Sequence, residues 1–420
     1  MTHTIDCTKI LLNIKDKNIN LYENYLEKCK INGITANIIH AFLTYNVNTC
    51  PLCKHKNCVI KWNWKRNCKV KISKVVNFNT IILLDKQRFK CNNCNHTFIA
   101  ESSLVDKYCN ISNDTKLSIK LDLMNKISEK DIAKNNNVSH NTVNRIIHSI
   151  SNKKVLPGVL PTIMNIDEFK ATNDTIGKMA FHIVNNRTGK TFDIIESRKS
   201  NFLFKYFMRF PRKQRLAVKF IILDMFEPYY LLLKKIFPNA ILITDKFHVV
   251  ALASNALKNT RVKCMKKDKK NYNKLKHYWK LIQKFEDDLD KDNKKYSNHF
   301  GKEITDYDIV SYIINTNKEL KATYEVYQGI LRSIKNKDAN LFCNIVSSNH
   351  ESISEYMKTT FKSLNKFSYH IIMSFNYNFN NGIIEDINNL IKCIKRIAFG
   401  YKSFYHFKTR ILLVSGIYKY

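Results

Sequence analysis

Two Cys-x-x-Cys pairs constrain the fold of this chain more than any other feature. They are Cys50-Pro-Leu-Cys53 and Cys91-Asn-Asn-Cys94, and the segment between them is rich in β-forming residues. Each pair offers two thiolates to one ion, and four thiolates complete a tetrahedral zinc shell with no open position for catalysis. The pattern predicts a small structural zinc module at residues 46–104. The gap between the pairs exceeds the commonest four-cysteine spacing, so one ligand has alternatives nearby: Cys58, Cys68, His55 and His96.

The charge of the chain indicates an anionic partner. Lys and Arg number 70 against 35 Asp and Glu, a formal net charge of +35, and nucleic acid is the expected screening partner. No uncharged apolar run approaches the roughly 18 to 20 residues of a membrane span. Charged residues also interrupt the short apolar stretch at the N-terminus, where a signal peptide would stand. We therefore expect a soluble, cytoplasmic protein without a membrane partner.

Helical patterns flank the zinc module. The apolar pattern of residues 1–45 predicts a mainly helical N-terminal segment, and it indicates no particular function. The candidate buried positions of this segment are Ile10, Leu11, Leu12, Ile14, Leu21, Tyr25 and Leu26. Residues 110–152 predict a helix-turn-helix, because Ser128 and Ser139 are placed to cap two short amphipathic helices. Its second helix would present to DNA the side chains of Ser139, Asn141, Thr142, Asn144 and Arg145. The alternative is an ordinary helix pair, since such pairs occur in many folds.

An alternation of strands and helices follows at residues 160–260. The strand signals lie at 162–167, 179–184, 191–195, 218–224 and 240–244, and the helix signals at 201–210, 228–237 and 247–257. This order fits an α/β fold, a mixed sheet with helices on both faces. Residues 261–370 have helical apolar spacing and many lysines, which predicts an α-helical insertion. From about Gly382 onward the chain returns to a strongly periodic helix.

Acidic residues at strand ends are the candidates for chemistry. Asp167 ends the first strand of the α/β region and Asp224 ends its fourth. Neighbouring strands lie roughly 5 Å apart, so two such carboxylates can share divalent ions, and oxygen ligands suit Mg²⁺. Two ions about 4 Å apart would activate the attacking oxygen and stabilise the leaving oxygen of a phosphodiester displacement. Glu385, early in the late helix, is the candidate third carboxylate. The alternative for each residue alone is a solvated or helix-capping role.

Four blocks of sequence carry a family resemblance. They are Ile166-Asp167-Glu-Phe169, Ile222-Leu-Asp224-Met-Phe-Glu-Pro-Tyr229, Asp245-Lys-Phe-His248 and Asn381-Gly-Ile-Ile-Glu385. With the tail Ile394-Lys-Arg396-Ile-Ala-Phe-Gly400-Tyr401, they resemble bacterial insertion-sequence transposases of the ISL-three family. The resemblance extends from about residue 45 onward, because that family also carries a zinc-binding module and a helix-turn-helix.

The resemblance implies an RNase H-like catalytic domain with a helical insertion, completed by residues 371–420. It implies a DDE triad of Asp167, Asp224 and Glu385 holding Mg²⁺ or Mn²⁺. Asp245 and His248 would then support the site, and Asp245 is the alternative to Asp224 as the second triad carboxylate. Lys and Arg residues near Glu385 are candidates for holding DNA phosphates: Lys392, Lys395 and Arg396, and after them Lys402, Lys408 and Arg410.

The implied function is DNA transposition. Such an enzyme binds the terminal inverted repeats of its own element, cuts the DNA there and joins the ends to target DNA. We expect a nucleoid-associated homo-oligomer, because two ends must be brought together. The main alternative is a non-catalytic zinc and helix-turn-helix regulator derived from a transposase. A nuclease with the same fold is a third hypothesis, and inverted repeats flanking the gene would argue against it.

Overall fold

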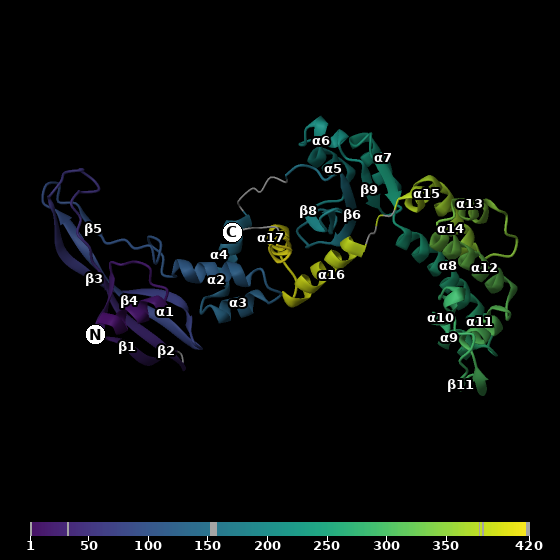
Figure 1. Cartoon of the computed structure of the whole chain (residues 1–420), viewed down its shortest axis with the longest axis horizontal. Coiled ribbons are helices and arrows are strands. Elements are labelled where there is room, and N and C mark those ends of the chain that lie inside the picture. The colour runs from purple at the N-terminus through teal and green to yellow at the C-terminus, as the bar shows by residue number, and fades with distance from the viewer. Residues whose placement is uncertain (1, 32, 152–157, 378, 380–381, 417–420) are drawn as a thin grey trace. The chain divides into compact units, whose positions relative to one another are not determined.

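The computed structural model describes residues 2–31, 33–151, 158–377, 379 and 382–416, and the chain forms two compact units. Unit 1 consists of Met1–Val155 with Ile391–Tyr420, and unit 2 consists of Leu156–Leu390. Helix α16 (Gly382–Ile397) runs through the point of division (Figure 1). Within the described part of the chain, no helix combines the length and apolarity needed to cross a membrane.

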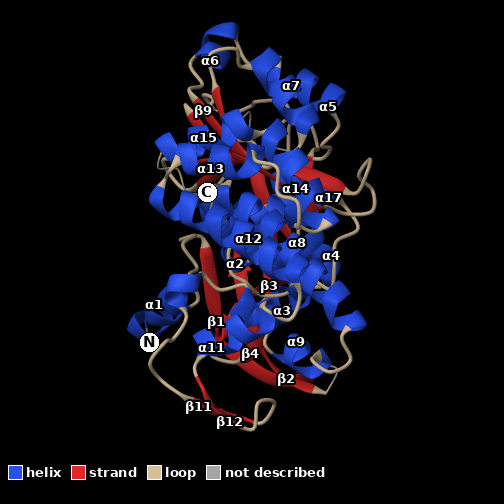
Figure 2. Ribbon diagram, turned by 90° about the vertical axis from the view of Figure 1, so that its right-hand side faces the viewer, coloured by secondary structure: helices blue, strands red, loops and turns tan. Residues whose placement is uncertain are grey.

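A five-stranded sheet builds the N-terminal part of unit 1. After helix α1 (Thr2–Leu11) its strands are β1 (Ile19–Ile31), β2 (Ile34–Leu43), β3 (Val59–Val75), β4 (Phe78–Cys91) and β5 (Thr97–Ile99). The order is β1-β2-β4-β3, with β5 paired to β4 and with β2 parallel to β4. Figure 2 draws these strands in red and labels β1 to β4. Its apolar core includes the fully buried Leu43, Ile82 and Leu84. The β2–β4 pairing joins residues 34–43 to the strand that ends at Cys91.

The prediction of a mainly helical segment at residues 1–45 is wrong. Only Thr2–Leu11 is helical, and the exposed fractions of Ile10 and Leu11 are 77% and 82%. The remainder is the β1–β2 hairpin, which turns at Gly33 with a φ of +78°. The register of β1 shifts between Leu21 and Leu26. A register shift breaks the two-residue alternation of a strand, so the apolar positions of β1 acquired a helix-like spacing.

Three helices follow in unit 1: α2 (Asn113–Asp122), α3 (Glu129–Asn135) and α4 (His140–Ser151). Both predicted caps are present, because Ser128 Oγ accepts from the Asp131 amide at 3.1 Å and Ser139 Oγ from the Thr142 amide at 3.3 Å. The buried core between the helices includes Ile119, Ile132, Val143 and Ile147. These helices occupy the range predicted for the helix-turn-helix.

The C-terminal helix α17 (Phe404–Val414) belongs to this helical core. Its Leu413 is buried in the same cluster as Val143 and Ile147 of α4. We expected residues 371–420 to complete the α/β core, and for residues 391–420 this expectation is wrong, because they group with unit 1. Arg410, a candidate for holding DNA phosphates, is only 2% exposed and donates to the carbonyls of Leu123, Asn125 and Ile127. Its guanidinium therefore stabilises the loop after α2.

Unit 2 contains a mixed five-stranded sheet, as predicted. Its strands are β6 (Ile163–Lys170), β7 (Met179–Asn185), β8 (Lys190–Ile195), β9 (Phe220–Leu223) and β10 (Ile241–Thr244). The order is β10-β9-β6-β7-β8, in which β6, β7 and β8 are antiparallel while β9 and β10 run parallel to β6. The accompanying helices are α5 (Ser200–Phe207), α6 (Arg212–Leu216), α7 (Glu227–Ile236) and α8 (Lys246–Lys267). Strands β9 and β10 are short apolar runs, as expected of parallel strands covered on both faces.

The insertion is helical apart from one small hairpin. Its helices after α8 are α9 (Tyr272–His277), α10 (Trp279–Ile282), the 3₁₀ turn η1 (Glu286–Asp288), α11 (Asp306–Ile314), α12 (Lys318–Asn336), α13 (Ala339–Ser347), α14 (Glu355–Lys366) and α15 (Ser368–Asn376). The strands β11 (Lys295–Ser297) and β12 (Lys302–Ile304) correct the expectation of helices alone. Three-residue strands are too short to show an alternating pattern.

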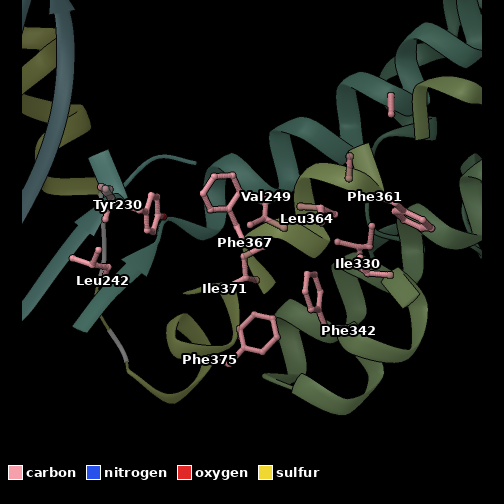
Figure 3. Close-up of a cluster of buried hydrophobic side chains, with 14 of the residues drawn as sticks. Tyr230, Leu242, Val249, Ile330, Phe342, Phe361, Leu364, Phe367, Ile371 and Phe375 are labelled. Atoms are coloured by element: carbon pink, nitrogen blue, oxygen red, sulfur yellow. The ribbon is translucent and has the colours of Figure 1, made fainter. Parts of the chain in front are cut away.

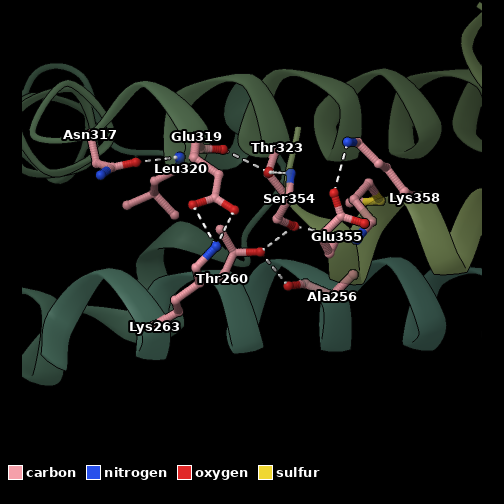
Figure 4. Close-up of polar contacts among 11 residues, drawn as sticks. Ala256, Thr260, Lys263, Asn317, Glu319, Leu320, Thr323, Ser354, Glu355 and Lys358 are labelled. Carbon is pink, nitrogen blue, oxygen red and sulfur yellow. Dashed lines mark hydrogen bonds and ion pairs between the residues drawn. The ribbon is translucent and has the colours of Figure 1, made fainter. Parts of the chain in front are cut away.

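Aromatic and aliphatic side chains fix the insertion against the sheet. Figure 3 shows Phe342, Phe361, Leu364 and Ile371 packed together, and all four are buried. The cluster continues to the sheet through Phe367, whose ring centroid lies 5.0 Å from that of Tyr230 in α7. Polar contacts add to this between the helices (Figure 4): Lys263 Nζ lies 2.6 Å from Glu319 Oε1, and Thr260 donates to Ser354 at 2.6 Å. The insertion and the sheet thus share one core.

Candidate active site

The ends of β9 and β10 bring three titratable side chains together. Asp224 follows β9 and Asp245 follows β10, and the parallel pairing of these strands places both carboxylates at the same edge of the sheet. His248, in the first turn of α8, has its Nδ1 3.0 Å from Asp224 Oδ1 and 3.2 Å from Asp245 Oδ2. The potential ligand atoms of all three residues lie within 4.8 Å of one another. Hydrogen bonding to Asp224 and Asp245 raises the pKa of His248 to about 10, so the ring is an imidazolium at neutral pH.

Asp167 lies on the neighbouring strand β6, which pairs in parallel with β9. Burial, and then the charge of Asp224, raise the pKa of Asp167 to about 6. The Glu168 amide donates to Asp167 Oδ1 at 2.6 Å, and the side-chain amide of Asn388 donates to Oδ2 at 2.5 Å. Asp167 and Asp224 are therefore electrostatically coupled across adjacent strands. The expectation that Asp167 ends its strand is wrong, because β6 continues to Lys170 through its pairing with β7.

Glu385 approaches this edge on α16. It is half-buried and stands three residues before Asn388, so the two side chains share one face of the helix about 4.5 Å apart along its axis. Because Asn388 bonds Asp167, this face of α16 lies against the carboxylate of β6. Among the described residues, the potential ligand atoms that lie within 4.8 Å of one another belong to Asp224, Asp245 and His248. Asp167 and Glu385 are not part of this group. The structure thus brings Asp167 and Asp224 together on adjacent strands and places Glu385 one helical turn from the Asn388–Asp167 contact.

The donor set of this edge fits a divalent cation. Its oxygens are carboxylates, the ligands that Mg²⁺ and Mn²⁺ prefer. Oδ1 of Asp224 is buried, and the group that faces it is the ring of His248, with Nδ1 at 3.0 Å. A divalent cation would balance the same pair of carboxylates whose charge this ring balances in the structure.

Three further residues around Asp167 were not predicted as functional. Glu168 accepts from the Tyr229 hydroxyl and lies 2.7 Å from Arg198 Nη1, so its charge is already paired. Asn388 and the buried His182 form a second set of contacts, described below. The three-residue spacing of Asn388 from Glu385 is a sequence signal that could have identified it.

The four predicted cysteines form a second candidate metal centre. The sulfurs of Cys50 and Cys94 are 3.7 Å apart, as are those of Cys53 and Cys91. A tetrahedral zinc site with Zn–S bonds of about 2.3 Å has sulfurs about 3.8 Å apart, so this geometry is compatible with zinc. A hydrogen bond from the backbone at His55 lowers the pKa of Cys53 to about 6, which favours the thiolate that a metal requires.

Cys58, the nearest alternative ligand, differs from these four. Its Sγ lies 3.4 Å from that of Cys91, but its thiol donates to the carbonyl of His55. Desolvation and the Cys91 thiol raise the pKa of Cys58 to about 11, and the pKa of Cys94 is also raised, so it is the distances between sulfurs that separate Cys58 from the four. Among the described residues, the possible zinc ligands that lie close to one another are Cys50, Cys53, Cys91 and Cys94. Cys58 is not part of this group.

The candidate DNA-binding side chains of α4 are unequally placed. Ser139, Asn141 and Arg145 are exposed and Asn144 is half-buried. Thr142 is buried at 7% exposure, so the expectation that it faces DNA is wrong. Its hydroxyl instead accepts from Arg145 Nη2 at 3.2 Å, which orients the arginine. It sits on the inner side of the first turn, next to Val143 in sequence.

The basic candidates of α16 lie in its last turns. Lys392 and Arg396 are exposed and share one helix face, whereas Lys395 has its Nζ 5.7 Å from the ring centroid of Phe407. All three belong to unit 1, while the carboxylate site belongs to unit 2. Helix α16 carries the basic residues and Glu385 on one continuous element.

Comparison with known proteins identifies the family. Residues 164–411 match the family model of ISL3 DDE transposases, which is described as "Transposase". The match spans more than half of the chain and includes Asp167, Asp224, Asp245, His248 and Glu385. The chain belongs to the ISL3 family of DDE transposases.

The transposase also matches a curated protein of a different name. It is 34% identical over 127 residues to an "ATP-dependent protease" of Lactococcus lactis subsp. lactis, a match that covers 30% of this chain and 41% of that protein. The chain thus spans less than half of that relative's length. Protease activity is a property given in the name of that relative alone.

Proposed function

We propose that this transposase binds the terminal inverted repeats of its insertion sequence and catalyses metal-dependent DNA cleavage and strand transfer. The observation that carries the proposal is the coupled pair of Asp167 and Asp224 on adjacent strands, beside the helix that bears Glu385. The strand order β10-β9-β6-β7-β8, with three antiparallel strands and two parallel ones, supports an RNase H-like catalytic domain. The non-catalytic regulator derived from a transposase does not require such a site.

Asp167, Asp224 and Glu385 are the proposed triad. Asp224 is preferred over Asp245 because its side chain is 33% exposed, whereas that of Asp245 is 9% exposed and caps α8 by accepting from the Phe247 amide. The chemistry that bound Mg²⁺ or Mn²⁺ supplies at such a site is activation of the attacking oxygen and stabilisation of the leaving one. Asp245 and His248 hold Asp224 in place, and the Glu168–Arg198 pair sits beside Asp167.

DNA recognition is assigned to unit 1. The exposed side chains at the start of α4, Asn141 and Arg145, are placed to reach base edges, as the N-terminal residues of recognition helices do. The zinc-bound sheet, Lys392 and Arg396 supply phosphate contacts, which give affinity rather than sequence choice. A homo-oligomer is proposed because two element ends must be joined in one complex.

The test is a mobilisation assay in cells with a marker between the element's own ends. Glu385→Gln is expected to reduce excision and insertion at least about 10³-fold, because a ligand worth several kcal/mol in the transition state is lost. The matched control is Asp386→Asn, which changes the adjacent, exposed acid and is expected to keep activity within about twofold. If neither wild type nor variant mobilises the marker while both bind the ends, the enzyme hypothesis fails and the regulator replaces it.

Replacing Arg145 tests the recognition helix. Arg145→Ala is expected to weaken binding to the element end by about 1–3 kcal/mol while changing binding to random DNA much less, since a base contact is lost. Fluorescence anisotropy with both DNAs at several salt concentrations measures this ratio. Lys130→Ala, at an exposed position of α3, is the control. Equal losses on both DNAs would mean that Arg145 contacts only phosphate.

A further inference from the structure

A line of buried polar side chains leads from β8 and β7 to Asp167, the proposed catalytic carboxylate. His182 of β7 stands directly opposite Asp167 of β6 in the strand register and is 0% exposed. Its Nε2 lies 2.9 Å from the hydroxyl of Thr191 on β8, and its Nδ1 lies 3.3 Å from Oδ1 of Asn388. The amide nitrogen of Asn388 in turn donates to Asp167 Oδ2. Three strands and α16 thus meet in one line of hydrogen bonds.

Only one direction of donation satisfies every group in this line. Asn388 uses its NH₂ on Asp167, so its oxygen faces His182 and must accept from Nδ1–H. Burial lowers the pKa of His182 to about 4, so the ring is neutral and its other nitrogen is an acceptor. The Thr191 hydroxyl therefore donates to Nε2. The order of donation is Thr191 to His182 to Asn388 to Asp167.

The same hairpin meets α16 at a second point. Gly189, in the β7–β8 turn, has a φ of +66°, and a Cβ built there would lie 3.6 Å from Cγ2 of Ile383. Ile383 and Asn388 lie on either side of Glu385 along the helix. The hairpin therefore contacts α16 before and after the turn that carries the third acidic residue. The hydrogen bond of His182 with Asn388 also links the hairpin to Asp167 of β6, because Asn388 donates to that carboxylate.

We propose that Asn388, oriented by His182 and Thr191, is a positioning residue that sets Asp167 and Glu385 relative to each other for cation binding. Asn388 prevents rotation of the Asp167 carboxylate, and because it is part of α16 it fixes the rotation of that helix, and so the direction of Glu385, at the same time. Each oxygen of Asp167 accepts one hydrogen bond and keeps a lone pair for a cation. The inference rests on the proposed function, since it assigns a role in that same site.

The decisive comparison uses Thr191, which touches neither DNA nor any proposed ligand. Thr191→Val keeps the shape of the side chain but removes the hydroxyl, so Nε2 of His182 loses its donor. The ring is then free to take the other tautomer, which presents an acceptor to Asn388 and turns its amide away from Asp167. Thr191→Ser keeps the hydroxyl. A merely structural role for this position predicts no advantage of Ser over Val.

The experiment measures two quantities in the full-length protein: Mn²⁺ binding, from the free Mn²⁺ signal in electron paramagnetic resonance, and Mn²⁺-dependent cleavage of an element end. Asn388→Ala is expected to lower both by about 10- to 100-fold, as residues that orient metal ligands do, with end binding within about twofold of wild type. Thr191→Val is expected to lower Mn²⁺ affinity severalfold and Thr191→Ser to restore it. Asn389→Ala, at the exposed neighbouring position, is the control.

The outcomes separate the inference from the proposed function. Wild-type Mn²⁺ affinity in folded Asn388→Ala would overturn the inference, and so would equal behaviour of Thr191→Val and Thr191→Ser. If wild type binds Mn²⁺ but does not cleave the end, the proposed function fails. In that case the Mn²⁺ affinities alone test the positioning role of Asn388. Lower affinity in Asn388→Ala and Thr191→Val than in wild type and Thr191→Ser supports the role, and equal affinities overturn it.

Discussion

Asp167→Asn is expected to abolish DNA cleavage while making the metal-free protein more stable. The cleavage loss follows because an amide cannot replace a carboxylate as a cation ligand, and we expect at least a 10³-fold decrease, about 4 kcal/mol. The gain in stability follows because the pKa of Asp167 is raised from 3.8 to about 6 by burial and by Asp224. The folded protein therefore binds the Asp167 proton more tightly than the unfolded chain does.

The sign of the pH dependence follows from this shift. Between the unfolded pKa of 3.8 and the folded pKa of about 6, the Asp167 contribution to stability falls as pH rises, and above that window the penalty is complete. Asn does not ionise, so the variant lacks this fall. We expect Asp167→Asn to gain on the order of 1–3 kcal/mol over wild type at neutral pH and much less at pH 4.

Urea unfolding in the presence of a chelator, at both pH values, measures the difference. Asp386→Asn is the matched control, because its exposed carboxylate has no buried charge to relieve. A variant that cleaves DNA at more than about 1% of the wild-type rate would contradict the catalytic role of Asp167. A variant with no gain in stability at neutral pH would contradict the electrostatic account of the Asp167–Asp224 pair.

Removing zinc is expected to unfold the cysteine-bearing end of the N-terminal sheet. Cys50 and Cys91 are both 0% exposed, and the cluster ties the loop before β3 to the end of β4. Structural zinc sites contribute about 10–16 kcal/mol of apparent binding free energy, more than a small module gains from its apolar core. Cys91→Ser is therefore expected to lose zinc, become sensitive to protease within residues 46–104, and bind element ends at least about tenfold more weakly.

Two further serine variants make this test specific. Cys109→Ser changes an exposed cysteine outside the cluster and is expected to retain one zinc ion per chain. Cys58→Ser is also expected to retain zinc, because its sulfur lies outside the group of four mutually close sulfurs and its thiol donates to the carbonyl of His55. Zinc content by atomic absorption, with limited proteolysis, gives the answer. Loss of zinc from Cys58→Ser but not from one of the four predicted ligands would reassign the site.

The elements that the sequence predicted well carry local signals. Asp224 and Asp245 directly follow short apolar strands, and Asp167 follows the apolar first half of β6, so their side chains meet where the parallel pairing of β6, β9 and β10 ends. The cysteine pairs are similarly local, because each Cys-x-x-Cys forms one half of a site. The mixed sheet of unit 2 followed from the order of such strands.

The features that the sequence missed depend on distant partners. The apolar residues of α17 do not show which helix covers them, and that helix is α4, more than 250 positions earlier in the chain. Thr142 has the side chain of a DNA contact, yet the helix rotation that buries it is set by the whole three-helix core. The contact of His182 with Asn388 joins residues 206 positions apart, which no local pattern encodes.

The β1–β2 hairpin is an exception among the missed features, because a local signal for it was present. The dipeptide Asn32-Gly33 is typical of a hairpin turn and could have predicted two strands here.

The most direct test of the central claim is strand transfer by the purified transposase. A labelled DNA end, already cut to expose its 3′-hydroxyl, is incubated with a circular target plasmid and Mg²⁺ or Mn²⁺. Joined products are then counted for wild type, Asp167→Asn, Asp224→Asn and Asp245→Asn. The account predicts metal-dependent joining by wild type, none by the first two variants, and reduced but measurable joining by Asp245→Asn. Joining that persists without divalent metal, or in Asp167→Asn, would contradict it.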